Sequence, residues 1–80
     1  MAIVYHFCPL PHFQKRLAER GISLEDCMAV VRTPDMRVRQ YQGENGGVVF
    51  RLAKDINNKK LVVVAEIRKN DVWLITCFEP

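Results

Sequence analysis

The sequence predicts an α+β fold in which two N-terminal helices pack on a four-stranded antiparallel sheet. Two segments with helical spacing follow residue 10, and four β-rich segments separated by short turns fill residues 36–78. The chain has 80 residues, which is enough for one hydrophobic core and not for two. We therefore expect one domain over residues 1–80.

The first helix is predicted from Pro11 to Arg20. Proline suits the first helical position, where its missing N–H costs nothing. Gly21 suits the left-handed residue that ends a helix, and Leu17 with Ile22 provides the apolar pair of a Schellman motif.

The second helix is predicted to begin at Ser23, which forms a capping-box-like pair with Asp26. An apolar stripe with helical spacing follows, made of Leu24, Cys27, Met28 and Val31. Thr33-Pro34-Asp35 ends this helix, because a proline disfavours helical geometry in the residue before it.

The remaining chain is predicted to form consecutive strands at Met36–Gln42, Val48–Lys54, Leu61–Arg68 and Val72–Phe78. In the first of them, alternation places Arg37, Arg39 and Tyr41 on the face opposite Met36 and Val38. The valine-rich third strand is expected at the centre of the sheet.

An additional N-terminal edge strand is predicted at Ala2–Phe7, before Cys8-Pro9-Leu10-Pro11 breaks it. This segment can pair within the chain or with a second copy, so a homodimer is one expected assembly.

Composition limits the class of protein. With 49% hydrophobic and 26% charged residues the chain is globular and not disordered. We expect a reduced, cytoplasmic protein for three reasons. The three cysteines show no paired pattern, we find no secretory leader, and no apolar run is long enough to span a membrane. We expect no cofactor and no membrane partner.

The net charge of +3 is a mild basic excess. Arginine supplies much of it, and its planar guanidinium grips a phosphate with two hydrogen bonds. This favours a nucleic-acid partner, although many proteins without one share such a charge.

His12, Arg16 and Arg20 are spaced i, i+4 and i+8 in the first helix, and we call them the basic ladder. They span an arc of about 80° and a length of about 12 Å, which can address more than one phosphate of an RNA strand. Imidazole transfers protons near neutral pH, and guanidinium stabilises phosphate charge. The alternative is a solvated helix face tempered by Glu19, and the residues alone favour that simpler interpretation.

The ladder with its continuation resembles a known pattern, H-x3-R-x3-R-G-[IV]-S, here His12 to Ser23 followed by an acidic helix start and Thr33-Pro34-Asp35. This pattern belongs to a family of small bacterial proteins of unknown function that is placed near the RelE/ParE-type toxins. Trp73–Phe78 resembles the family's closing strand, so the likeness covers nearly the whole chain.

The resemblance implies the RelE/ParE-toxin-like fold, and relatives that cleave RNA without a metal and are paired with an antitoxin protein. It implies site roles for His12, Arg16 and Arg20, and for Thr76. Many members have a tyrosine after that threonine, whereas this chain has Cys77-Phe78 and lacks the phenol.

Metal-free RNA cleavage uses the 2′-hydroxyl as nucleophile and needs a base, an acid and cations for the phosphate. His12 is the predicted base or acid, and Glu66 is the best second candidate because it interrupts an apolar strand. Glu66 and Arg68 on one face can instead form a surface ion pair. Further RNA-binding candidates are Arg51, Arg68, Thr76 and Tyr41.

Two functions remain open from the sequence. The first is a toxin-like, metal-independent endoribonuclease, and the second is a non-catalytic protein-interaction module of the same fold. A metal site at His6, Cys8 and His12 is disfavoured by the intervening prolines and the lack of a fourth ligand. If the nuclease hypothesis holds, His12 and Arg16 should face a sheet surface that bears Arg51 or Glu66.

Overall fold

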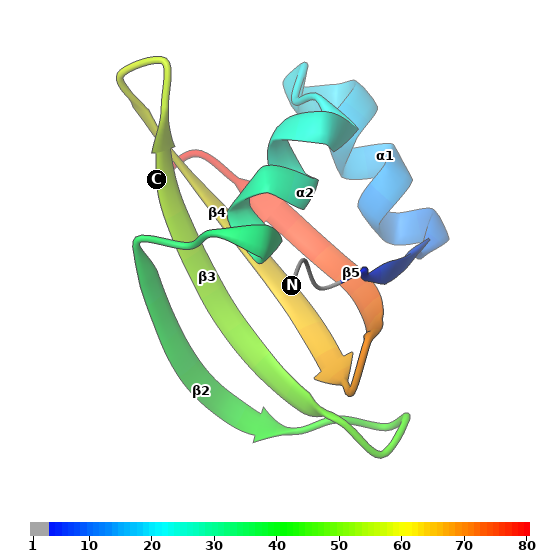
Figure 1. Ribbon diagram of the computed structural model, residues 1–80. Coiled ribbons are helices and arrows are strands. Elements are labelled where there is room, and N and C mark those ends of the chain that lie inside the picture. Colours follow the sequence, from blue (N-terminus) through cyan, green and yellow to red (C-terminus); the bar gives the residue numbers. More distant parts are fainter. Residues whose placement is uncertain (1–3) are drawn as a thin grey trace.

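The computed structural model describes residues 4–80 and contains two helices and a five-stranded sheet (Figure 1). In chain order the elements are β1 (His6–Pro9), α1 (Pro11–Arg20), α2 (Leu24–Arg32), β2 (Met36–Gln42), β3 (Val48–Ile56), β4 (Lys59–Arg68) and β5 (Asp71–Phe78). The predicted α+β class is confirmed, and strands β2 to β5 form the expected antiparallel meander. The complete sheet is nevertheless mixed, with the order β1-β5-β4-β3-β2.

Strand β1 makes the sheet mixed because it pairs in parallel with β5, with His6 opposite Asp71. The expected N-terminal edge strand therefore exists within the chain, but it lies later than predicted and includes Cys8 and Pro9. A proline is tolerated at an edge, where its missing N–H faces no neighbouring strand. Ala2 and Ile3 of the predicted segment lie outside the described residues.

The end of α1 and the start of α2 both follow from the local sequence. Gly21 adopts a left-handed φ of 62°, and the N–H of Ile22 donates to the carbonyl of Leu17 at 3.1 Å, as in a Schellman motif. At the start of α2, the Ser23 hydroxyl accepts from the backbone N–H of Glu25 at 3.1 Å. The cap is thus a simple serine cap, without the predicted exchange with Asp26.

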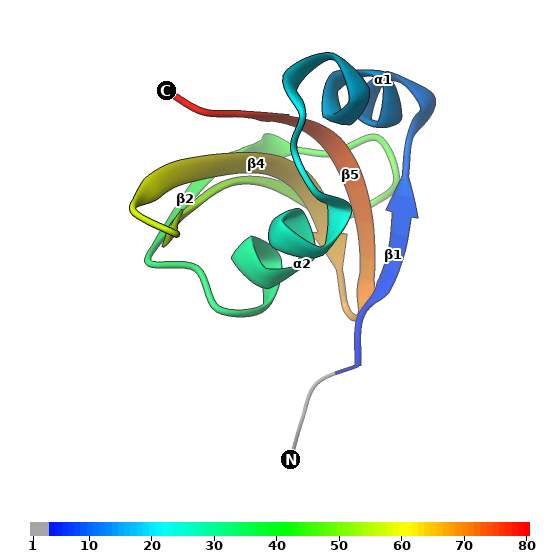
Figure 2. The ribbon, with the colours of Figure 1, turned by 90° about the horizontal axis from the view of Figure 1, so that it is seen from above.

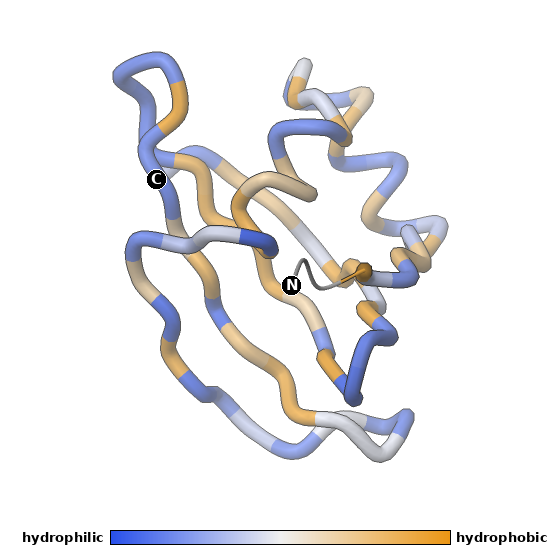
Figure 3. Tube along the Cα trace, viewed as in Figure 1, coloured by the Kyte–Doolittle hydropathy of each residue, from blue (hydrophilic) through white to orange (hydrophobic). Residues whose placement is uncertain are grey.

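The core lies between the helices and one side of the sheet. Figure 2 shows the sheet bending round α2, while α1 lies along β5. Fully buried side chains from every layer meet there, among them Phe13, Val30, Leu52, Val63 and Leu74. In Figure 3 the apolar residues follow the central strands and the inner helix faces, and the hairpin loops are hydrophilic.

The side of the sheet turned away from α2, which we call the far face, carries the site. Because side chains alternate along a strand, Val49, Glu66 and Trp73 lie on the far face when Leu52, Val63 and Leu74 lie in the core. α1 borders this face at β5, and β2 is exposed along its whole length.

Two β-bulges adjust which side chains reach the far face. The register skips Gln40 in β2 and Ile75 in β5. The first bulge places Tyr41 opposite Val49, on the face of Met36 and not on that of Arg37 and Arg39 as simple alternation predicts.

The two helices have 10 and 9 residues, and neither is long and apolar enough to cross a membrane within the described part of the chain.

Candidate functional site

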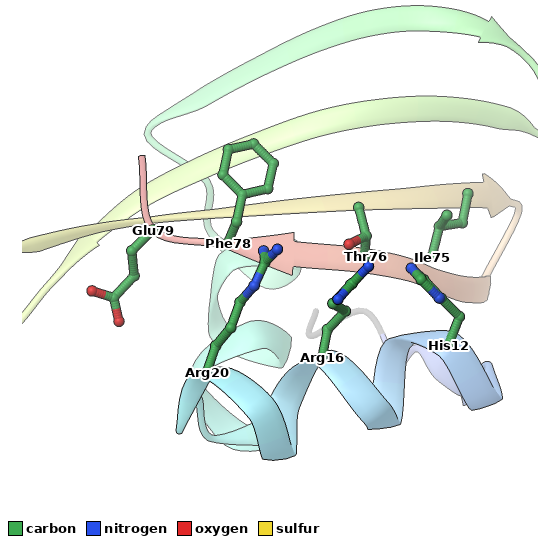
Figure 4. A pocket seen from close by; sticks show the side chains of 7 residues that line it. All are labelled: His12, Arg16, Arg20, Ile75, Thr76, Phe78 and Glu79. Carbon is green, nitrogen blue, oxygen red and sulfur yellow. The ribbon is translucent and has the colours of Figure 1, made fainter.

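The basic ladder occupies the side of α1 that packing leaves free. Phe13 is fully buried and Leu17 is half-buried against the core, so they fix the rotation of the helix. His12 and Arg20 are exposed and Arg16 is half-buried. The predicted stripe therefore exists, and its side chains point together toward β5 (Figure 4).

A hollow of about 810 Å³ lies between this stripe and the C-terminal half of β5, and we call it the ladder groove. Its lining residues are His12, Arg16, Arg20, Ile75, Thr76, Phe78 and Glu79. In Figure 4, Ile75 lies near His12, Thr76 near Arg16 and Phe78 near Arg20. The groove thus has an imidazole and two guanidiniums on the α1 wall and the Thr76 hydroxyl on the β5 wall.

The Arg20 guanidinium is held by the sheet, whereas that of Arg16 is paired at the surface. Arg20 Nη1 donates to the carbonyl oxygen of Cys77 at 2.7 Å, which ties the end of α1 to β5. Arg16 Nη1 lies 2.8 Å from Glu19 Oε2, an exposed pair that solvent screens. Since a guanidinium has five N–H donors, both arginines retain donors for an anion.

Thr76 enters the groove because of the bulge at Ile75. The register pairs Thr76 with Val64 on the far face, one position after the skipped residue. Its half-buried hydroxyl is a neutral donor and acceptor opposite Arg16.

Arg51 is a neighbour of the groove and does not line it. Its guanidinium carbon lies 5.5 Å from the centre of the Phe78 ring, and Phe78 is a lining residue. Arg51 therefore lies beside the Arg20 end of the groove and not opposite His12, where the nuclease hypothesis expected it. The cation is in position to extend the positive groove along the far face.

Glu66, the predicted second proton-transfer group, is placed elsewhere. It is 3% exposed and does not line the ladder groove. Its carboxylate accepts from the backbone N–H groups of Asn45 and Gly47, both at 2.8 Å, and from Asn45 Nδ2 at 3.1 Å. These bonds hold the β2–β3 hairpin loop, so the carboxylate has a structural task there.

The other two predicted RNA-binding residues also lie outside the ladder groove. Arg68 is exposed at the end of β4, beside Gly46 of the hairpin loop. Tyr41 is 59% exposed on β2 and lines a second hollow of the far face, together with Glu66 and Trp73. The structure thus brings His12, Arg16, Arg20 and Thr76 together and separates them from Glu66, Arg68 and Tyr41.

Phe78 and Glu79 line the groove, although the sequence did not single them out. Phe78 was detectable, because it shares the alternation of Thr76 in the last strand. No pattern in the sequence predicted Glu79, whose position depends on the path of the chain after β5. Glu79 lies near Arg20 in Figure 4, at the opposite end of the groove from His12.

Behind the groove, the Cys27 and Cys77 thiols are fully buried next to each other. Burial raises the pKa of Cys77, although the adjacent Cys27 and Arg20 act in the opposite direction. Burial also raises the pKa of Cys27 well above its ordinary range. Both thiols are therefore protonated core groups, as predicted for Cys77.

The family described as "Domain of unknown function (DUF4258)" matches residues 10–79. The chain belongs to this family. The match begins just before α1 and covers both walls of the ladder groove. No curated protein and no solved structure is significantly similar to the chain.

Proposed function

We propose that this DUF4258 protein binds RNA in the ladder groove and cleaves it without a metal, as a toxin-like endoribonuclease. The observation that carries the proposal is the convergence of His12, Arg16 and Arg20 on one groove, opposite the Thr76 hydroxyl. They lie on the side of α1 that Phe13 and Leu17 leave free, where Arg20 also bonds to the Cys77 carbonyl.

RNA fits the groove by charge and by length. The ladder extends over about 12 Å of helix, which spans neighbouring phosphates of a single strand. Arg20 is already oriented by the Cys77 carbonyl, so less of its side-chain entropy is lost on binding. Arg51 beside Phe78 continues the positive surface for the rest of the strand.

Cleavage would proceed by transesterification within the RNA. An imidazole nitrogen of His12 takes the proton of the 2′-hydroxyl, and the 2′-oxygen then forms a bond to phosphorus. The bond from phosphorus to the 5′-oxygen breaks, and that oxygen takes a proton from the imidazolium or from water. Arg16 and Arg20 stabilise the added negative charge, and the products are a 2′,3′-cyclic phosphate and a 5′-hydroxyl.

The proposed biological setting combines two arguments from the sequence. The resemblance to RelE/ParE-type toxins implies an antitoxin protein as partner, and three cysteines in no paired pattern favour a reduced, cytoplasmic location. A small acidic protein encoded next to this one would have the expected charge, because the chain has a net charge of +3.

A non-catalytic protein-interaction module is the second candidate, and strand β2 favours it. All seven residues of this edge strand are exposed, including Met36 at 56% and Val38 at 43%. A free edge of this kind can accept a strand from a partner or from a second copy of the chain.

The test is incubation of the purified protein with single-stranded RNA in EDTA. We expect wild-type protein to produce 2′,3′-cyclic phosphate ends, and His12→Ala to lower the rate by about a hundredfold or more. Lys15→Ala is the matched control, because Lys15 is an exposed cation of the same helix outside the groove. RNA binding is measured in parallel by fluorescence anisotropy, with Arg16→Ala expected to weaken it about tenfold.

Cleavage that His12→Ala leaves unchanged would remove His12 from the chemistry. Binding that depends on Arg16 without any cleavage would leave an RNA-binding protein. Absence of both would favour the interaction module.

A further inference from the structure

A second hollow adjoins the ladder groove on the far face. Its volume is about 220 Å³, which is large enough for one nucleobase. Its lining residues are Leu10, Tyr41, Gly43, Glu44, Asn45, Val49, Glu66, Trp73 and Ile75. Ile75 lines both cavities and lies beside His12 in Figure 4, so the second hollow opens from the His12 end of the groove.

This hollow follows a row of residues across four strands, whose two middle members, Val49 and Glu66, are buried. Tyr41 is paired with Val49, Val49 with Glu66, and Glu66 with Trp73. Two aromatic side chains therefore stand at the two ends of the row, with a valine and a buried carboxylate between them. The bulge at Gln40 is required for this arrangement, because it brings Tyr41 onto the far face.

One wall of the hollow is the hairpin loop, and Glu66 makes that wall rigid. The three hydrogen bonds to its carboxylate fix the backbone of Asn45 and Gly47. Gly43 packs so closely on Glu66 that an added Cβ would lie 2.1 Å from its Cδ. Glu44, between these fixed residues, is exposed and lines the hollow. Its carboxylate is therefore available to a molecule that enters the hollow.

We infer that the second hollow is a nucleobase subsite that selects guanine in the strand bound by the ladder. Aromatic side chains stack on any base, so Trp73, which lies next to Ile75 in the lining, supplies affinity without selecting a base. A carboxylate accepts hydrogen bonds and cannot donate them. Guanine alone among the four RNA bases offers two adjacent donors, N1–H and the N2 amino group, to the two oxygens of Glu44.

The subsite lies beyond His12 in the direction away from Arg20, so it takes the nucleotide next to the phosphate at His12. This inference rests on the proposed RNA function for the position of the strand. Recognition of the base itself depends only on the hollow, and it is measurable without cleavage.

Trp73 is the only tryptophan of the chain, so its fluorescence reports directly on this hollow. We expect 5′-GMP to quench it saturably and at least about tenfold more tightly than 5′-AMP, 5′-CMP or 5′-UMP. N-acetyltryptophanamide measured with each nucleotide corrects for collisional quenching and absorption. Glu44→Gln should abolish the preference, and Glu25→Gln is the control with the same charge change on an exposed residue outside the hollow.

If RNA binding needs Arg16 but the four nucleotides quench Trp73 equally, or none of them quenches it, the guanine subsite is overturned and the proposed function stays intact. Guanine-selective quenching that Glu44→Gln removes would support the subsite, even if the ladder bound no RNA and the proposed function failed. Selective quenching that persists in Glu44→Gln would contradict the role given to Glu44.

Discussion

Glu66 is a carboxylate almost without solvent contact, and it faces three N–H donors of one loop. A buried charge is tolerated when hydrogen bonds replace its hydration, and here two of the donors are backbone groups that have no other acceptor. The same bonds satisfy the polar groups of a loop that closes over the sheet. Glu66 is therefore best described as a positioning residue for the second hollow.

Replacing Glu66 by alanine should lower the free energy of unfolding by about 1–3 kcal/mol, because buried N–H groups of the loop lose their acceptor. Glu66→Gln should cost less, since its amide oxygen still accepts from the backbone and the Asn45 side chain can reverse to pair with it. Urea unfolding followed by Trp73 fluorescence measures both. Equal stability of the two variants and wild type would contradict this role. An activity loss in Glu66→Gln at unchanged stability would restore Glu66 as a proton-transfer candidate.

At the scale of elements, α1 determines the direction of the ladder. Its rotation is set by Phe13 in the core, and its end is set by Gly21 and by the Arg20 bond to the Cys77 carbonyl. Gly21 lets the chain turn directly after Arg20, so α1 ends where its last side chain bonds to β5.

Gly21→Ala should destabilise the protein by about 1 kcal/mol, because a side chain disfavours the left-handed φ of 62°. The cause is backbone strain and not crowding, since a Cβ at this position would meet no atom within 4 Å. Gly21→Asn should lose less, because asparagine tolerates this conformation better. Thermal unfolding of the three proteins checks the order, and an alanine variant as stable as wild type would show that the strain is relieved elsewhere.

At the scale of the whole molecule, α2 is joined to the sheet through buried contacts that include the Cys27 and Cys77 thiols. Burial raises the pKa of both thiols in the folded chain, so they keep their protons at pH values where the unfolded chain releases them. The buried thiols make their full contribution to the free energy of unfolding at pH values below the ordinary thiol pKa. This contribution falls as the pH rises above the ordinary thiol pKa.

The free energy of unfolding should consequently decrease between about pH 7.5 and about pH 9.5, the range in which free thiols ionise. Urea titrations at both values measure the decrease. A variant with Cys27→Ala and Cys77→Ala should lose less stability over the same interval, whatever its starting stability. If both proteins lose the same amount, the thiols do not cause the pH dependence.

The amino-acid sequence alone encodes the features that depend on neighbouring residues. Proline at the start of α1, glycine after its end and the spacing of the ladder are all local, so helix bounds and the common face of His12, Arg16 and Arg20 were predictable. The antiparallel meander was predictable as well, because short turns join its strands.

The way in which distant segments meet depends on long-range contacts of the folded chain. The parallel pairing of β1 with β5 joins residues more than sixty positions apart, and no local pattern encodes it. Bulges at Gln40 and Ile75 depend on the register between strands, and they determine which side chains reach the far face. For the same reason Glu66, a catalytic candidate because it interrupts an apolar strand, holds a loop, while Glu79 enters the groove. The role of a side chain depends on the residues that it contacts in the folded chain, and those residues lie far away in the sequence.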